Sequence, residues 1–382
     1  MRIKLRQAFD LQMGKTPARN RPDYWNGDHK WISIADIGNA GKFLTKTKES
    51  ITKAGIDGSG IKVVPQGTVI MSFKLSIGKT AITSEDMYTN EAIMAFIDNG
   101  KFAVDTDYLY HLCCGTNWTA GTNKAVMGLT LNKATLLEKE IPLPDINEQH
   151  EIATKLDKID AIIAERQQQL ELIDQAVKSR FIELFGDIVL NPFGWEKDYL
   201  GVVCDVRDGT HDSPHYHSTG FPLVTSKNVT GGEIDLTDCS LISEADFNKI
   251  NERSKVNMGD IIMPMIGTVG KPVIVNVEPN FAIKNVSLIK FKVDSRVLNT
   301  FVRSLLQSDY FDDAVLSKVR GGTQKFISLG DIRKLAVIVP PMELQEQFAA
   351  FVEQTDKSKL AVQKGLQELE ILKKSLMQQY FG

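Results

Sequence analysis

The chain has 382 residues, which is enough for two or three domains with hydrophobic cores of their own. Hydrophobic residues make up 42% of it and charged residues 24%, and no apolar run approaches the roughly 18–20 residues of a membrane-spanning helix, so the composition favours a soluble globular protein. The net charge of −3 excludes a protein that is basic overall, so binding to nucleic acid requires local basic patches or a basic partner.

Residues 1–145 are expected to form a strand-rich domain. Short β-rich runs such as 31–34 and 67–71 are separated by Gly, Asn, Asp and Pro. The segment carries 18 Lys and Arg against 15 Asp and Glu, a positive balance in a chain that is negative overall. Its N-terminus has no apolar signal region, and the four cysteines of the chain form no C-x-x-C pair, so we expect a cytoplasmic protein without structural disulfides or a zinc site.

Residues 146–186 are expected to form one long helix. No Gly or Pro occurs between Asn147 and Phe185, and Asn147 is the expected N-cap. At about 1.5 Å per residue this helix would be roughly 57 Å long, more than a compact domain of this size needs. Its apolar side chains recur mostly at steps of four and three, a pattern typical of a coiled-coil seam that only Arg166 interrupts. They are Ile152, Leu156, Ile159, Ile163, Leu170, Ile173, Val177 and Leu184.

Residues 187–340 and 341–382 repeat this order of a strand-rich domain followed by a long helix. The second domain contains β-rich runs such as 260–263, and the second helix has its own apolar seam, flawed by Lys359 near a core position and by Gly365. That seam runs through Phe348, Val352, Thr355, Val362, Leu366, Leu369, Leu372, Leu376 and Tyr380. The two helices bury their stripes most easily against each other, and two-fold symmetry between the halves predicts an antiparallel coiled coil.

The two halves are related by an internal duplication. A shift of 198 residues places Pro142 on Pro340 and Gln149 on Gln347, and both helices end in Phe-Gly. Within the domains the likeness is weak: residues 67–82 correspond to 259–274 at a shift of 192, and residues 119–126 to 319–326 at a shift of 201. Similar helices beside diverged domains indicate that the two domains recognise different ligands.

The chain resembles the specificity subunit of Type I restriction–modification enzymes. The motifs that carry the resemblance are GKTP and YWNGDHKWISIADI between Gly14 and Ile37, and DGTHDSPHY and GFPLVTSKNVT between Asp208 and Thr230. The NEQ start of the first helix, the NPFGW segment from Asn191 to Trp195 and the Phe-Gly ends complete it. One departure is that the first domain begins almost at Met1, so its support is expected to come from the C-terminal helix.

The resemblance implies an α+β fold with two target-recognition domains in a pseudo-two-fold arrangement, joined by two long helices. Each domain would read one half of a bipartite DNA sequence, the coiled coil would set the spacer, and methyltransferase subunits, two in number, and restriction/translocase subunits would assemble around it. S-adenosylmethionine would bind to the methyltransferase partner, and ATP and Mg to the restriction partner. The expected segments are a first recognition domain (1–145), a central conserved helix (146–186), a second recognition domain (187–340) and a C-terminal conserved helix (341–382).

Candidate DNA-binding residues in the first half lie in a Pro-interrupted loop that combines cations with Tyr24 and Trp25. These residues are Lys15, Thr16, Arg19 and Arg21. Lys79 and its counterpart Lys271 in the second half follow glycines and are candidates for contacts with DNA phosphates.

The second half offers a polar loop with Thr210, His211 and Ser213, and Lys227 in the next motif, whose side chains suit base edges or phosphates. Two corresponding Gly-rich loops add amide and cationic groups, which can pair with adenine and guanine. They contribute Thr122, Asn123 and Lys124 in the first half and Arg320, Thr323, Gln324 and Lys325 in the second.

Catalytic interpretations are weaker. Gly78-Lys79-Thr80 and Gly14-Lys15-Thr16 end like a P-loop, but Phe73 and Phe9 stand where its first glycine belongs. His211, His215 and His217 with nearby Asp residues lack a second ligand set for a metal. Asn191-Pro192-Phe193 is only a fragment of an adenine-methyltransferase motif, so we expect no catalytic centre and no bound cofactor or metal.

A coiled-coil scaffold whose globular ends bind proteins is the alternative from another functional class. Duplex DNA binding that weakens with salt distinguishes the two, because phosphate contacts release counterions and a protein scaffold makes none.

Overall fold

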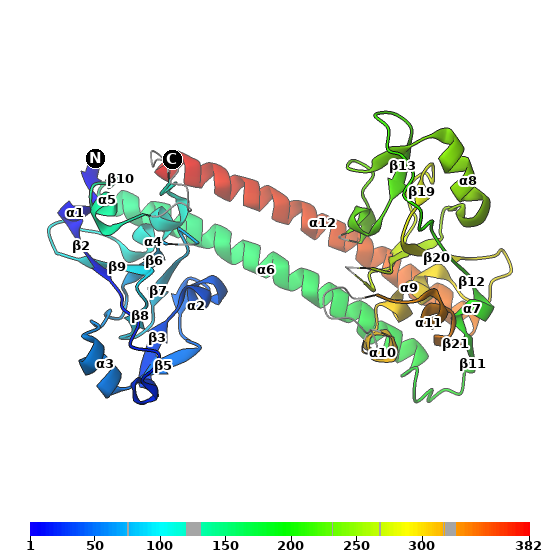
Figure 1. The fold of residues 1–382 in the computed structure, drawn as a ribbon, viewed down its shortest axis with the longest axis horizontal. Helices are drawn as coiled ribbons and strands as arrows, with labels where there is room; N and C mark the ends of the chain where they lie inside the picture. Colours follow the sequence, from blue (N-terminus) through cyan, green and yellow to red (C-terminus); the bar gives the residue numbers. More distant parts are fainter. Residues whose placement is uncertain (75, 120–130, 231, 267–268, 316, 318–325) are drawn as a thin grey trace. The chain divides into compact units, whose positions relative to one another are not determined.

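The computed structural model describes residues 1–74, 76–119, 131–230, 232–266, 269–315, 317 and 326–382. They divide into two compact units, which are coloured along the sequence in Figure 1. Unit 1 comprises Met1–Gln167 with Lys364–Gly382, and unit 2 comprises Gln168–Gln363. Each unit therefore joins a strand-rich globular part to one segment of each long helix, and the predicted α+β class is confirmed.

Unit 1 is built on a five-stranded sheet with the strand order β2-β9-β6-β7-β4. Neighbours in it are antiparallel except β4 and β7. A three-stranded sheet, β5-β3-β8, and a two-stranded one, β1-β10, flank it. The strands are β1 (Arg2–Lys4), β2 (Phe9–Met13), β3 (Trp25–Ile32), β4 (Phe43–Leu44), β5 (Glu49–Ile51), β6 (Val69–Ser72), β7 (Thr80–Thr83), β8 (Tyr88–Thr89), β9 (Ile93–Asp98) and β10 (Glu140–Pro142). The short helices are α1 (Leu5–Ala8), η1 (Pro22–Tyr24), α2 (Ile34–Asn39), α3 (Lys53–Ser59), α4 (Thr106–Gly115) and α5 (Lys133–Leu137).

Unit 2 repeats this plan with a four-stranded sheet β12-β20-β17-β18, a three-stranded sheet β16-β13-β19 and the pair β11-β21; β14 and β15 form a further hairpin. Its strands are β11 (Glu196–Tyr199), β12 (Asp205–Asp208), β13 (Phe221–Val224), β14 (Val229–Thr230), β15 (Glu233–Ile234), β16 (Ser240–Ile242), β17 (Ile261–Pro264), β18 (Val273–Ile274), β19 (Ala282–Ile283), β20 (Val286–Lys290) and β21 (Ala336–Val339). Its short helices are α7 (Leu200–Val203), η2 (Ser226–Asn228), α8 (Glu244–Ser254), α9 (Asn299–Leu306), α10 (Asp309–Ala314) and α11 (Leu329–Arg333).

The weak duplication at a shift of 192 residues is confirmed by these strands. Gly67 and Gly259 precede the buried strands β6 and β17, and both have left-handed backbone, with φ of 75° and 82°. A side chain is strained in this conformation, so both halves keep glycine there. The second repeat, 119–126 with 319–326, falls almost entirely outside the described residues.

Both long helices are present, as α6 (Ile146–Phe185) and α12 (Met342–Phe381). The predicted N-cap, Asn147, is wrong: the Asp145 carboxylate accepts from the backbone N–H groups of Asn147 and Glu148, at 3.0 and 3.1 Å. Asp145 follows a proline and faces the free N–H groups of the first turn, which makes it the better cap. Among the described helices, none combines the length and apolarity that a membrane span requires.

The helices run antiparallel within unit 2, as predicted. Phe181 of α6 packs on Phe348 of α12, with ring centroids 5.5 Å apart. Seven residues earlier on α6, Asp174 accepts a 2.6 Å hydrogen bond from Lys359, which lies later on α12. The lysine that flawed the sequence pattern is thus paired with a carboxylate beside the seam.

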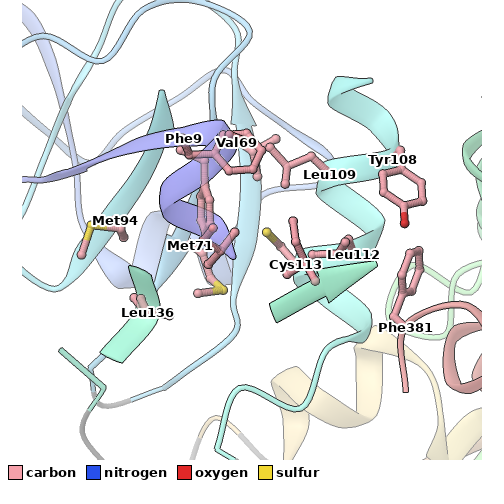
Figure 2. Packing of buried hydrophobic residues seen from close by; sticks show 14 of the residues in the cluster. Phe9, Val69, Met71, Met94, Tyr108, Leu109, Leu112, Cys113, Leu136 and Phe381 are labelled. Atoms are coloured by element: carbon pink, nitrogen blue, oxygen red, sulfur yellow. The ribbon is translucent and has the colours of Figure 1, made fainter. Parts of the chain in front are cut away.

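In unit 1 the end of α12 packs into the domain core. Phe381 lies next to Tyr108 of α4, with ring centroids 5.6 Å apart, and Figure 2 shows the two rings side by side. Both belong to a cluster that also contains Ile152 and Leu156 of α6. A Cβ on Gly115 would lie 2.7 Å from the Phe381 ring, so the helix end fits closely against α4. The C-terminal helix therefore supports the N-terminal domain, as expected.

A buried glutamine fastens the start of each long helix to its domain. Gln149 is fully buried; its amide group donates to the carbonyls of Ala103 and Pro144 and accepts from the N–H of Asp105. Gln345 does the same with the carbonyls of Arg296 and Pro340 and the N–H of Leu298.

These contacts correct the register of the duplication. Gln149 corresponds to Gln345, a shift of 196 residues that also equates Phe185 with Phe381. The predicted shift of 198 is wrong, because it matched Gln149 with Gln347, an exposed residue with the same letter two positions along. Gln149 and Gln345 are equivalent because they make the same hydrogen bonds, whereas Gln347 shares only the residue type with Gln149.

Replacing Gln345 with Ala is expected to lower the free energy of unfolding by about 2–3 kcal/mol, because three buried backbone groups lose their partners. Gln347→Ala on the same helix is the matched control and is expected to change it by less than about 0.5 kcal/mol. Chemical denaturation followed by circular dichroism measures both. Equal effects from the two variants contradict the corrected register.

A second junction in unit 1 ties α6 to the domain through charge. Lys42 donates to both Asp157 oxygens on α6 at 2.7 Å and pairs with Asp107 on α4. His111, also on α4 and fully buried, places Nε2 at 2.8 Å from Asp157, whereas its Nδ1 has no partner among the described residues. Burial lowers the pKa of His111 and outweighs the attraction of Asp157, so the folded unit disfavours the charged ring more than the unfolded chain does.

Unit 1 is expected to lose stability as the pH falls below about 6.5, the ordinary pKa of histidine, because the unfolded chain then binds a proton that the folded one excludes. The slope reaches up to about 1.4 kcal/mol per pH unit, and His111→Gln removes it while keeping an N–H donor for Asp157. Urea denaturation between pH 5 and 8, followed by tryptophan fluorescence, reports mainly on this unit, which holds Trp25, Trp31 and Trp118. The same slope in both proteins contradicts this account.

Candidate nucleic-acid interface

The first candidate loop follows strand β2 in unit 1. Gly14 and Lys15 donate their N–H groups to the carbonyls of Ile93 and Thr89, at 3.2 and 2.9 Å. A Cβ on Gly14 would lie 2.0 Å from the Thr89 oxygen, so only glycine allows this approach. Lys15 extends to the Ser59 carbonyl, and Thr16 donates its hydroxyl to Glu91. The loop is therefore pinned on both sides.

Partial burial opposes ionisation of Glu91, but hydrogen bonds from the Thr16 hydroxyl and a backbone amide outweigh it and hold the pKa of this carboxyl below its usual value. Glu91 is thus a carboxylate at neutral pH and acts only as an acceptor.

The two arginines of this loop are paired with carboxylates and lie on aromatic rings. Arg19 donates to Glu49, at 3.1 Å through one of its nitrogens, and lies 3.9 Å from the ring centroid of Trp25. Arg21 forms a two-pronged contact with Asp23, at 2.9 and 2.7 Å. These hydrogen bonds lower the pKa of both carboxyl groups, so each arginine charge is partly neutralised. The arrangement orders the guanidinium groups rather than leaving them as mobile charges.

The loop borders a shallow hollow of about 580 Å³. Lys15, Thr16 and Arg21 line it together with Tyr24 and Glu91. Cationic, hydroxyl, aromatic and carboxylate groups thus face one concave surface, a mixture that suits the phosphates and base edges of DNA.

The second candidate loop follows strand β12 and occupies the same place in unit 2. Gly209 and Thr210 donate to the carbonyls of Val286 and Ile283, at 2.9 and 3.0 Å, and a Cβ on Gly209 would lie 2.4 Å from the Ile283 oxygen. The two loops share a single glycine directly after the strand, Gly14 after β2 and Gly209 after β12, and this alone does not reveal their equivalence in the sequence. Lys15 and Thr16 thus correspond to Thr210 and His211.

The side chains of the second loop are held by a network. His211 places Nδ1 at 2.9 Å from the Asn285 amide oxygen and Nε2 at 2.9 Å from Asp208. Asp208 is buried and also accepts from Arg253 of α8, whereas Ser213 accepts from Lys284 at 2.6 Å. Histidine and aspartate here form part of a hydrogen-bonded loop, and no group of three or more metal-ligating side chains occurs among the described residues.

The remaining candidates divide into two sets. Lys79, Lys227 and Lys271 are exposed, and the turns that carry Lys79 and Lys271 each contain a left-handed glycine. Lys79 precedes strand β7 directly rather than a helix, which a P-loop requires. The Gly-rich loops lie outside the described residues. Those candidates are Thr122, Asn123, Lys124, Arg320, Thr323, Gln324 and Lys325.

A family model for the Type I restriction modification DNA specificity domain matches residues 1–173 and residues 192–371. The chain belongs to this Type I specificity family. The family resemblance found in the sequence is thereby confirmed.

Individual relatives of this Type I specificity protein agree. The Type I restriction enzyme MjaIX specificity subunit of Methanocaldococcus jannaschii is 25% identical over 399 residues, covering 98% of this chain and 90% of the relative. The S subunit of a Type I restriction-modification system from M. genitalium has a TM-score of 0.56 at 16% identity, covering 100% of this chain and 96% of that one. A chain from a structure concerned with complex assembly and conformational transition of the type I R-M system has a TM-score of 0.60 at 19% identity, covering 100% and 97%. At these identities the structural likeness shows the fold.

Sequence reasoning missed four residues of these loops in the Type I specificity protein. Glu91, Lys284 and Asn285 hold Thr16, Ser213 and His211, and Arg253 holds Asp208, which in turn contacts His211. Each lies 45 to 75 positions from its partner in the chain. No local pattern marks them. The two glycines, Gly14 and Gly209, were the available signal, because each is followed by a candidate loop.

Proposed function

We propose that this chain is the DNA sequence-specificity subunit of a Type I restriction–modification system. The observation that carries the proposal is that the family model matches both repeats, and that each repeat presents a glycine-pinned polar loop at the same place in its fold. The loops differ in their side chains, Lys15-Thr16 against Thr210-His211. Equivalent frames with unlike loops suit a bipartite target with two different halves.

In this proposal the segments 1–145 and 187–340 are the target-recognition domains, and the conserved helices, 146–186 and 341–382, set the spacer between the half-sites. The helix pair would also dock the methyltransferase subunits. The half-buried seam supports this role: Ile163, Leu170 and Ile173 are only half-buried and Leu172 is exposed, so apolar surface remains for a partner.

Chemistry would come from the partners. Methyltransferase subunits would carry S-adenosylmethionine and restriction subunits would carry ATP and Mg, whereas this chain would only recognise the sequence. The organisation of both candidate loops supports a binding role, since hydrogen bonds hold their polar groups in place.

Exchanging residues 1–145 for the same segment of another specificity subunit is expected to change one half of the methylated sequence and leave the other half and the spacer intact, because the core around this segment contains no described residue of 187–340. Methylome sequencing of cells that express the chimaera with its methyltransferase partner measures this. A change in both halves contradicts the proposal.

Lys79→Ala and Lys271→Ala are each expected to reduce the salt dependence of duplex binding by about one unit of log K per log of salt concentration, equally for target and non-target DNA. Lys197→Ala is the control, because Lys197 already donates to the Val189 carbonyl at 3.0 Å. Equilibrium binding of the full chain with its methyltransferase partner, between about 50 and 200 mM salt, measures the slope. An unchanged slope in both variants contradicts these phosphate contacts.

A further inference from the structure

Both candidate loops are fastened to the turn that precedes a central strand. In unit 1 the Thr16 hydroxyl donates to Glu91, two residues before β9. In unit 2 the His211 ring contacts Asn285, the residue directly before β20. Strands β9 and β20 pair with β2 and β12, from which the loops emerge, so the two fastenings are equivalent in the fold.

The fastening in unit 2 requires an unusual backbone. Asn285 has left-handed φ of 55°, a conformation that costs free energy for a residue other than glycine and is best tolerated by Asn and Asp. There its N–H donates to the Thr210 carbonyl at 3.1 Å and its side-chain oxygen meets His211 at 2.9 Å. One residue therefore holds the loop by both backbone and side chain.

The same contacts decide what His211 is free to do. Asn285 occupies one ring nitrogen and buried Asp208 the other, while Arg253 holds the far oxygen of Asp208. Both ring nitrogens lie against the protein, at Asn285 and Asp208, so neither is directed at a base edge. His211 is a support of the loop, whereas the exposed Asp212 side chain and the Ser213 hydroxyl, which still has its proton to donate, are left to face a ligand.

We propose that Glu91 and Asn285 are positioning residues that set the sequence discrimination of their own units through the loops they hold. The inference rests on the proposed function. A loop held in one geometry matches correct base edges and leaves polar groups unpaired at wrong ones, whereas a loose loop adapts to both. Losing the fastening therefore reduces discrimination between sequences more than it reduces affinity.

The chain offers a matched pair of substitutions at each position. Asn285→Gly removes the side chain and suits the left-handed backbone, whereas Asn285→Asp keeps an acceptor oxygen and tolerates the same φ. Glu91→Met keeps the length of the side chain without an acceptor, and Glu91→Gln keeps an oxygen for Thr16. Charge changes alter binding to every duplex alike, so the ratio of target to non-target binding is independent of them.

The experiment uses the full chain with its methyltransferase partner. Duplexes carry the target found by methylome sequencing, or one base change in either half-site, and the half read by each unit is known from the domain exchange. Asn285→Gly is expected to reduce discrimination about tenfold in the half read by unit 2 alone, the loss of roughly 1.4 kcal/mol. Glu91→Met does the same for unit 1, and the Asp and Gln variants stay within about twofold of the wild type.

Two controls accompany the measurement of discrimination. The unaffected half-site in the same variant shows that the protein is folded, and faster hydrogen exchange at residues 210–213 in Asn285→Gly shows that the loop is loosened. If the loop is loosened but discrimination is unchanged, the inference is wrong and the proposed function stands. An equal loss of discrimination in both half-sites leads to the same conclusion. Failure of the wild-type complex to prefer any sequence overturns both.

Discussion

Neither long helix can bury its apolar stripe alone, and this constraint determines how each unit is completed. Unit 1 takes residues 364–382 from the far end of the chain, and Phe381 closes its core against Tyr108. Unit 2 uses the end of the first helix in the same way, since Phe185 packs on Phe301 and Phe348. Each domain therefore rests on two helix segments that come from different repeats.

The two repeats share the groups that position the backbone and differ in the side chains of their loops. The buried glutamines Gln149 and Gln345 have the same three hydrogen bonds, and Gly14 and Gly209 allow the same close approach between a loop and a strand. These groups position the backbone. The side chains that follow the two glycines are unlike, as are their partners, Glu91 and Asn285. A frame that is common to both repeats thus carries two loops of different chemistry, as the proposed reading of two different half-sites requires.

Charge is used sparingly in these loops. Arg19 and Arg21 are paired with carboxylates and His211 with Asp208, so the net attraction to a polyanion is small and the polar groups are ordered instead. Such a surface suits discrimination between sequences better than strong non-specific binding, in keeping with a chain whose net charge is −3. In the proposed function, exposed lysines such as Lys79 and Lys271 would supply affinity through phosphate contacts.

The sequence by itself determined the two long helices, the alternation of domains and helices, and the family, because helical periodicity and ordered motifs are local properties of the chain. It also located two of the candidate loops through Lys15 and His211. The tertiary structure decided the register of the duplication, the N-cap at Asp145 and the supports of the loops. The supports of the loops depend on pairing between distant strands: Asn285 reaches His211 only because β20 lies beside β12, and its left-handed backbone has no signature in the neighbouring residues.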